Sequence, residues 1–147
     1  MSPHRLEPVT SILSDIQDRF PTPGSFLERL EVLRWPHGAT CPYCHSRRNS
    51  PVPKESRYHC NYCNCSFSVT TGTFMSGTRL DLRTWLAAVG IVLLSDHREF
   101  TARRLAATLS INRNTACRVT RAIETARHTE AALLSSLNLL LTEERNH

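Results

Sequence analysis

The sequence predicts a small α+β protein that is mostly helical, in which a cysteine-rich ribbon lies between an N-terminal helical segment and a C-terminal helix-turn-helix. Two C-x-x-C pairs lie near the middle, and apolar residues recur at helical spacing on both sides of them. Forty per cent apolar residues and only five glycines are typical of a folded chain. We expect four parts: a helical segment (1–38), the ribbon (39–75), the helix-turn-helix (79–128), and an amphipathic helix with a tail (129–147).

The N-terminal segment predicts two short helices. Apolar residues at helical spacing indicate a helix over Val9–Phe20, and Pro21–Gly24 breaks it. Ser25 is then expected to cap a second helix over Phe26–Leu33. Glu28 lies three residues after Ser25, as in a capping box.

The two cysteine pairs predict a metal site. Fifteen residues separate Cys41 and Cys44 from Cys60 and Cys63, which is the spacing of a four-cysteine zinc ribbon. Each pair offers two thiolates, and a hairpin brings the pairs together around one tetrahedral Zn²⁺. The alternative is four unrelated buried thiols. Because a shell of four sulfurs leaves no open position for water or substrate, the zinc is expected to be structural.

Three further residues near the pairs could be mistaken for ligands. Cys65 lies outside the C-x-x-C phase, so it is expected to be a free thiol, because tetrahedral zinc takes four ligands. His45 and His59 are expected to be exposed or to donate a hydrogen bond to a cysteine sulfur. The ribbon should also contain two short strands and one polar loop: Tyr58–Cys60, Phe67–Thr70 and Ser46–Pro53.

The C-terminal half predicts three helices in succession. Asp81 should cap the first, which runs to about Leu94, and Ser95–Phe100 should form a polar turn. Thr101 is expected to cap a second helix, and Asn112 a third after a tight turn. Two short helices followed by a turn and a basic third helix are typical of a helix-turn-helix.

A leucine stripe follows on the C-terminal helix. Its spacing is helical but too short for a coiled coil. It either packs against the preceding helices or forms the seam of a homodimer. The stripe consists of Leu133, Leu134, Leu137, Leu140 and Leu141.

The positive charge is concentrated in the middle of the chain. Residues 41–128 carry thirteen Lys and Arg against five acidic residues, whereas both flanking segments are net negative. This distribution indicates a polyanionic partner, and double-stranded DNA is the partner we expect. An ordinary solvated Arg-rich face is the alternative. The residues expected to contact DNA are Arg113, Asn114, Arg118 and Arg121 on the third helix, Arg103 and Arg104 on the second, and Arg47, Arg48, Lys54 and Arg57 on the ribbon.

The sequence argues against a membrane protein and against an enzyme. The longest apolar run, Trp85–Leu94, is ten residues long, whereas a membrane span needs about twenty. The N-terminus has no apolar core typical of a signal peptide, so a cytoplasmic, nucleoid-associated location is expected. The few aspartates do not form a nuclease-like acidic set, and we expect no catalytic residues.

Several stretches resemble the N-terminal zinc-ribbon region of a family of bacterial insertion-sequence transposases. These are F-L-E-R-L-E-V-L-R-W-P-H-G-A-T-C-P-Y-C-H-S, then Y-H-C-N-Y-C-N-C-S-F-S-V-T-T-G-T-F, then L-D-L-R-T-W-L-A-A-V. The segment T-A-R-R-L-A-A-T-L-S-I-N-R-N-T-A-C-R-V-T-R-A-I looks like the helix-turn-helix of that family. His45 departs from the pattern, since the family usually has Gly after the first cysteine pair.

The resemblance implies a role in transposition and DNA recombination. In the family this region binds the inverted repeats at the element ends, and a following domain with an acidic triad cuts and joins DNA. The chain ends where that domain would begin, so we expect DNA binding without strand transfer by this chain alone. It would be a truncated transposase, a DNA-binding partner of a separate catalytic subunit, or a regulator. The competing hypothesis is a protein-interaction adaptor that docks a catalytic or transcription partner.

Overall fold

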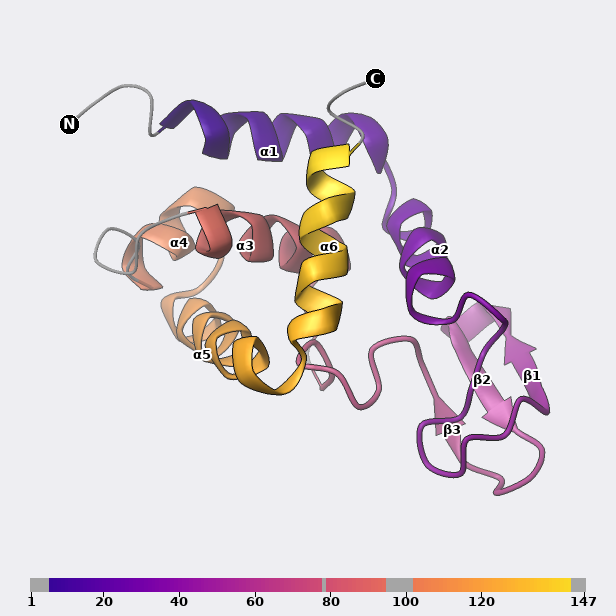
Figure 1. Cartoon of the computed structure of the whole chain (residues 1–147). Coiled ribbons are helices and arrows are strands. Elements are labelled where there is room, and N and C mark those ends of the chain that lie inside the picture. Colours follow the sequence, from indigo (N-terminus) through magenta and orange to yellow (C-terminus); the bar gives the residue numbers. More distant parts are fainter. Residues whose placement is uncertain (1–5, 78, 95–101, 144–147) are drawn as a thin grey trace.

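The computed structural model describes residues 6–77, 79–94 and 102–143, and it places them in two lobes (Figure 1). A helical lobe contains most of the chain, and a three-stranded sheet with its loops forms the smaller ribbon lobe. The expected turn Ser95–Phe100 and the expected cap Thr101 lie outside the described residues. In chain order the elements are α1 (Leu6–Arg19), α2 (Pro23–Arg34), β1 (Asn49–Val52), a 3₁₀ turn (Pro53–Glu55), β2 (Arg57–Cys60), β3 (Ser66–Phe67), α3 (Leu82–Leu94), α4 (Ala102–Leu109), α5 (Arg113–Thr129) and α6 (Ala131–Glu143).

Helix α3 is the centre of the helical lobe. Residues 85–92 are all buried, because α1, α4, α5 and α6 pack around them. Gly90 allows this packing: a Cβ at that position would lie 2.7 Å from Leu141 Cδ1 and 3.3 Å from Ile12 Cδ1. Asp81 caps the helix as predicted, since its carboxylate accepts the Arg83 backbone N–H at 2.9 Å. Among the described residues, no helix has the length and apolar character needed to cross a membrane.

The leucine stripe of α6 packs inside the chain. Four of its five members are buried against the rest of the helical lobe: Leu134, Leu137, Leu140 and Leu141. The carbonyl of Leu140 also accepts a hydrogen bond from Arg19 of α1 at 2.8 Å. Of the two alternatives, packing against the preceding helices is therefore correct, and the stripe is not available as a dimer seam.

The N-terminal helices begin earlier than predicted. Helix α1 starts at Leu6, and α2 starts at Pro23, three residues before Phe26. Thr22 is the true cap of α2: its Oγ1 accepts the Ser25 N–H at 3.2 Å, and Ser25 Oγ accepts the Thr22 N–H at 3.3 Å. The predicted cap at Ser25 with Glu28 is thus wrong. Pro23 fits the first helical turn, because its fixed φ suits a helix and its missing N–H has no partner there.

The ribbon sheet has the antiparallel order β1-β2-β3. Strand β2 contains the predicted Tyr58–Cys60, whereas β3 ends at Phe67 and does not reach Thr70. The expected loop Ser46–Pro53 is wrong over its second half, which forms β1. Pro51 lies in this strand and obscured it in the sequence; an edge strand tolerates proline because one side needs no partner.

An aromatic cluster joins α2 to the sheet. The Trp35 ring meets the rings of Tyr58 and Phe67 edge-on at 5.5 and 5.7 Å, and those two rings stack at 5.7 Å. The Tyr58 hydroxyl also donates to Glu31 Oε1 of α2 at 2.8 Å. Burial and this contact raise the pKa of Tyr58 to about 12. Helix α2 therefore connects the two lobes, since it also packs against α3.

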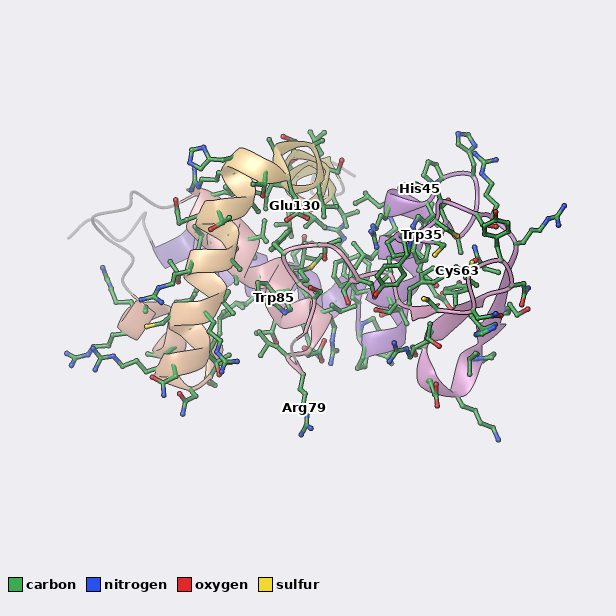
Figure 2. All side chains as sticks on the ribbon, turned by 90° about the horizontal axis from the view of Figure 1, so that it is seen from below. Trp35, His45, Cys63, Arg79, Trp85 and Glu130 are labelled. Carbon is green, nitrogen blue, oxygen red and sulfur yellow. The ribbon has the colours of Figure 1, made fainter. Side chains whose placement is uncertain are left out.

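The segment after β3 is held from both lobes. Arg34 of α2 donates to the carbonyls of Val69 and Thr71, the latter at 2.9 Å. From the other side, Glu130 at the α5–α6 junction accepts the Phe74 N–H at 3.1 Å. Figure 2 shows Trp35 on the ribbon side and Glu130 on the helical side. These contacts fix the ribbon relative to the helical lobe.

Candidate metal centre and nucleic-acid interface

The two cysteine pairs lie on two knuckles with the same backbone geometry. In the first, the His45 N–H donates to the Cys41 carbonyl at 2.9 Å, and the Cys41 N–H donates to the Ser46 carbonyl at 3.0 Å. His45 has a φ of 65°. This left-handed conformation favours glycine, so the departure of His45 from the family pattern falls where the backbone is least suited to a side chain.

The second knuckle repeats these bonds nineteen residues later in the sequence. Asn64 N–H donates to the Cys60 carbonyl at 2.9 Å, Cys60 N–H donates to the Cys65 carbonyl at 2.9 Å, and Asn64 has a φ of 62°. Asparagine tolerates this conformation better than most residues. The role of Cys65 follows from the repeat. It occupies the position of Ser46, closes the knuckle through its carbonyl, and has an exposed side chain.

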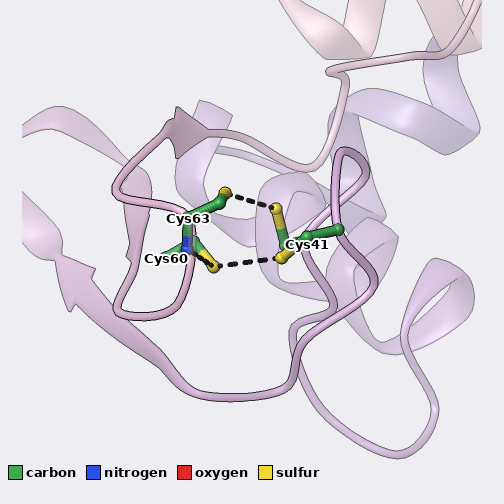
Figure 3. Close-up of side chains that lie close together, drawn as sticks. Cys41, Cys60 and Cys63 are labelled. Atoms are coloured by element: carbon green, nitrogen blue, oxygen red, sulfur yellow. Dashed lines mark hydrogen bonds between the residues drawn. The ribbon is translucent and has the colours of Figure 1, made fainter.

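The knuckles bring the four predicted cysteines together (Figure 3). The sulfur of Cys41 lies 3.7 Å from that of Cys63, and the sulfur of Cys44 lies 3.5 Å from that of Cys60. All four sulfurs are within 4.8 Å of one another. A Zn–S bond of about 2.3 Å predicts tetrahedral edges of about 3.8 Å, so the cluster fits one zinc ion. Neither His45 nor His59 belongs to it.

The surroundings of Cys60 favour the thiolate that zinc requires. Its side chain is fully buried, and its sulfur accepts the Cys63 N–H at 3.4 Å. This backbone hydrogen bond, together with one from Tyr62 and the contacts to Cys44 and Cys63, lowers the pKa of Cys60 to about 6 although burial opposes the change. Burial and the contacts between the sulfurs raise the pKa of Cys44 and bring that of Cys63 to about 12, so Cys60 is the cysteine of the cluster that most favours the thiolate. With four sulfur ligands the shell is closed, and a zinc ion held there would stabilise the small sheet instead of taking part in a reaction.

Helix α5 has a buried face and an exposed basic face, as the sequence predicts. Ala116, Val119 and Ile123 are buried against the helical lobe. The helix begins where expected, because Asn112 Oδ1 accepts the Asn114 N–H at 2.7 Å. The predicted contact residues of this helix are all exposed: Arg113, Asn114, Arg118 and Arg121.

The remaining predicted contact residues are exposed as well. Arg103 and Arg104 lie on α4, which packs against α5. Arg47 and Arg48 follow the first knuckle, and the ribbon hairpin carries the last two, Lys54 and Arg57. Exposure is necessary for the predicted role, while contact with DNA stays a prediction for each residue.

One residue that sequence reasoning did not single out is Arg79, between the ribbon and α3. It lines a surface depression with Thr115 and Arg118 of α5. In the sequence Arg79 counts only as one of many basic residues, because it lies in no motif. Its place beside α5 is visible only in three dimensions.

Residues 23–66 match a family model described as the transposase zinc-ribbon domain. The matched stretch runs from the start of α2 through both knuckles to the start of β3, so the chain is similar to that domain over less than half of its length. Helices α3 to α6 lie outside the match. No curated protein matches the chain. No solved structure matches it either.

Proposed function

We propose that the chain is a zinc-dependent protein that binds duplex DNA, in a role similar to the end-recognition part of an insertion-sequence transposase. The observation that carries the proposal is the exposed face of α5, where Arg118 and Arg121 lie opposite the buried face of the helix. The match to the transposase zinc-ribbon domain supports the inverted repeats at element ends as the DNA bound.

The geometry around the start of α5 suits a helix that enters the major groove. The short helix α4 packs against it, and Ser110, with a φ of 56°, makes the tight turn between them. In a helix-turn-helix the N-terminal residues of the second helix reach the base edges. Asn114 suits adenine, Arg118 suits guanine, and the positive end of the helix dipole suits phosphate.

The zinc site would act through the shape of the ribbon. The sheet is too small to fold on its own apolar surface, so metal binding is expected to contribute folding free energy. A folded ribbon would hold Arg47, Arg48 and Arg57 in fixed positions beside the helical lobe. Zinc dependence of DNA binding is therefore part of the proposal.

The experiment that tests the proposal is a selection of duplexes from a random pool on zinc-loaded protein, followed by affinity measurements on variants. Arg118→Ala and Arg121→Ala should each weaken binding to the selected duplex by about 1–3 kcal/mol and relax its sequence preference. Arg29→Ala on α2 is the matched control, since Arg29 is exposed but lies outside the basic face. Unchanged affinity in the two α5 variants would show that this helix does not read the DNA.

We propose that a separate chain catalyses strand transfer, and that this chain supplies the DNA binding at the nucleoid. Purified protein incubated with element-end DNA and Mg²⁺ should leave the DNA intact. Cleavage that requires an acidic residue of this chain would overturn this part of the proposal.

A second candidate function is a protein-interaction adaptor for a catalytic or transcription partner. The observation that favours it is the exposure of Tyr43 and Tyr62, at 60% and 74%, at the same position of the two knuckles. A partner that is captured equally by the wild type and by Tyr43→Ser/Tyr62→Ser would exclude this surface. The leucine stripe is buried and cannot serve the adaptor.

A further inference from the structure

Two surface depressions, one on the ribbon and one beside α5, share Gly77 in their lining. The depression on the ribbon side is lined by residues of the first knuckle, of β2 and of the segment after β3, including Tyr43, Arg57, Ser68, Thr70 and Gly77. The depression on the helical side is lined by Gly77, Arg79, Thr115 and Arg118. Because Gly77 lines both, the two depressions adjoin at this residue, and together they are called the groove below.

The lining of this groove has the chemistry of a phosphate-binding surface. It contains three arginines, Arg57, Arg79 and Arg118, against one carboxylate, Glu55. The lining also carries hydroxyl groups, among them those of Ser68 and Thr70, whose oxygens lie 3.1 Å apart. Arginine and hydroxyl side chains are among the usual donors to the phosphate oxygens of the DNA backbone.

Arg79 occupies the middle of this arrangement. Figure 2 shows its side chain projecting away from the body of the protein, between the ribbon lobe and α5. The segment that carries it is fixed upstream, since Thr73 and Met75 are buried and Phe74 is bound by Glu130. An anchored segment reduces the backbone freedom that is lost on binding, so the remaining cost is that of ordering the Arg79 side chain.

We propose that the groove holds the phosphate backbone of a DNA duplex whose bases are read by α5, and that Arg79 contacts a phosphate between the ribbon and that helix. The inference rests on the proposed function and adds a binding surface to it. The charge of the groove selects a polyanion. Arg79 lies on no helix that enters the major groove, so its contact is independent of base sequence and positions the ribbon on the duplex.

The test compares Arg79→Ala with Arg29→Ala in salt titrations against two labelled duplexes, one selected on the wild type and one of mixed sequence. Loss of one phosphate contact reduces the slope of log affinity against log salt by about 0.9. Raising the salt from about 50 to 200 mM should therefore weaken binding of the variant by a factor that is about three to four times smaller than the factor for the wild type. Arg79→Ala should show this change on both duplexes, Arg79→Lys should restore the slope, and Arg29→Ala should leave it unchanged.

The outcomes separate this inference from the proposed function. Equal slopes for Arg79→Ala, Arg29→Ala and the wild type would refute phosphate binding by the groove. A loss of selectivity in Arg118→Ala would still support α5 as the helix that reads the bases. A change for Arg79→Ala on the selected duplex alone would assign Arg79 to base reading and would also overturn the inference. A selection on the wild type that enriches no duplex, together with no binding to the mixed-sequence duplex, would overturn both proposals.

Discussion

Substitution of Arg34 by alanine should destabilise the attachment of the ribbon to α2 and to the segment that leads into α3. The Arg34 guanidinium donates to the carbonyls of Val69 and Thr71, and it lies 5.4 Å from the centre of the Trp35 ring. Val69 is only 2% exposed, so water cannot readily replace the lost donor at this position. Two backbone carbonyls would lose a charged partner in one change.

The magnitude follows from two opposing effects. Hydrogen bonds to a charged group contribute about 1.5–3 kcal/mol each. Burial lowers the pKa of Arg34, with Glu130 partly offsetting this, so removal of the cation also relieves a desolvation cost. We expect a net loss of about 2–4 kcal/mol in the free energy of unfolding; 3 kcal/mol corresponds to roughly 6–12 °C in the melting temperature for a chain of this size.

The assay is thermal and urea unfolding of zinc-loaded protein, with zinc content measured in each variant. Arg34→Lys should recover less than half of the loss, because one ammonium cannot fork onto two carbonyls. Arg29→Ala on the exposed side of the same helix should cost less than about 1 kcal/mol. If Arg34→Ala melted at the same temperature as Arg29→Ala with full zinc content, the stabilising role of the hydrogen bonds from Arg34 to Val69 and Thr71 would be refuted.

Two further predictions concern packing and pH. In urea unfolding, Gly90→Ala should destabilise the helical lobe by about 1–2 kcal/mol, because the clash with Leu141 exceeds the gain in helix propensity. The control is Gly24→Ala in α2, where a Cβ meets nothing within 4 Å; it should be neutral or stabilising in the same experiment. In an alkaline absorbance titration, Tyr58 should ionise late, near 12, above the ordinary tyrosine pKa of about 10. Because its folded pKa is raised, the neutral Tyr58 stabilises the fold fully below the unfolded value, and that contribution is lost as the pH rises through the folded value. Tyr58→Phe should remove the late phase, and its persistence in that variant would contradict the assignment.

The metal centre and the core face of α5 could be predicted from the sequence because both depend on local spacing. Cys41 and Cys60 each lie in a C-x-x-C repeat whose geometry is set by a few neighbouring hydrogen bonds. The burial of Val119 and Ile123 follows from helical periodicity and the cap at Asn112. Local patterns of this kind need no knowledge of the rest of the fold.

The missed features depend on partners that are distant in the sequence or on a choice between similar local signals. Thr22 and Ser25 are both good caps, and only the helical fit of Pro23 decides between them. Strand β1 exists because its residues pair with β2, which overrides the turn signal of Pro51. The periodicity of the leucine stripe predicts that its leucines share one face of the helix, but it does not predict which surface packs against that face. Arg79 acquires a candidate role only because Gly77 and Arg118 line the same groove.

The most direct test of the central claim is DNA affinity measured as zinc is returned to metal-free protein. Chelation should release one zinc per chain, unfold the ribbon and weaken binding to the selected duplex, while α3, α5 and α6 keep most of the helical signal. One equivalent of zinc should restore affinity and ribbon structure together, and Cys60→Ser should prevent both. Full affinity of the metal-free protein for the same duplex would contradict the claim that zinc shapes a DNA-binding surface.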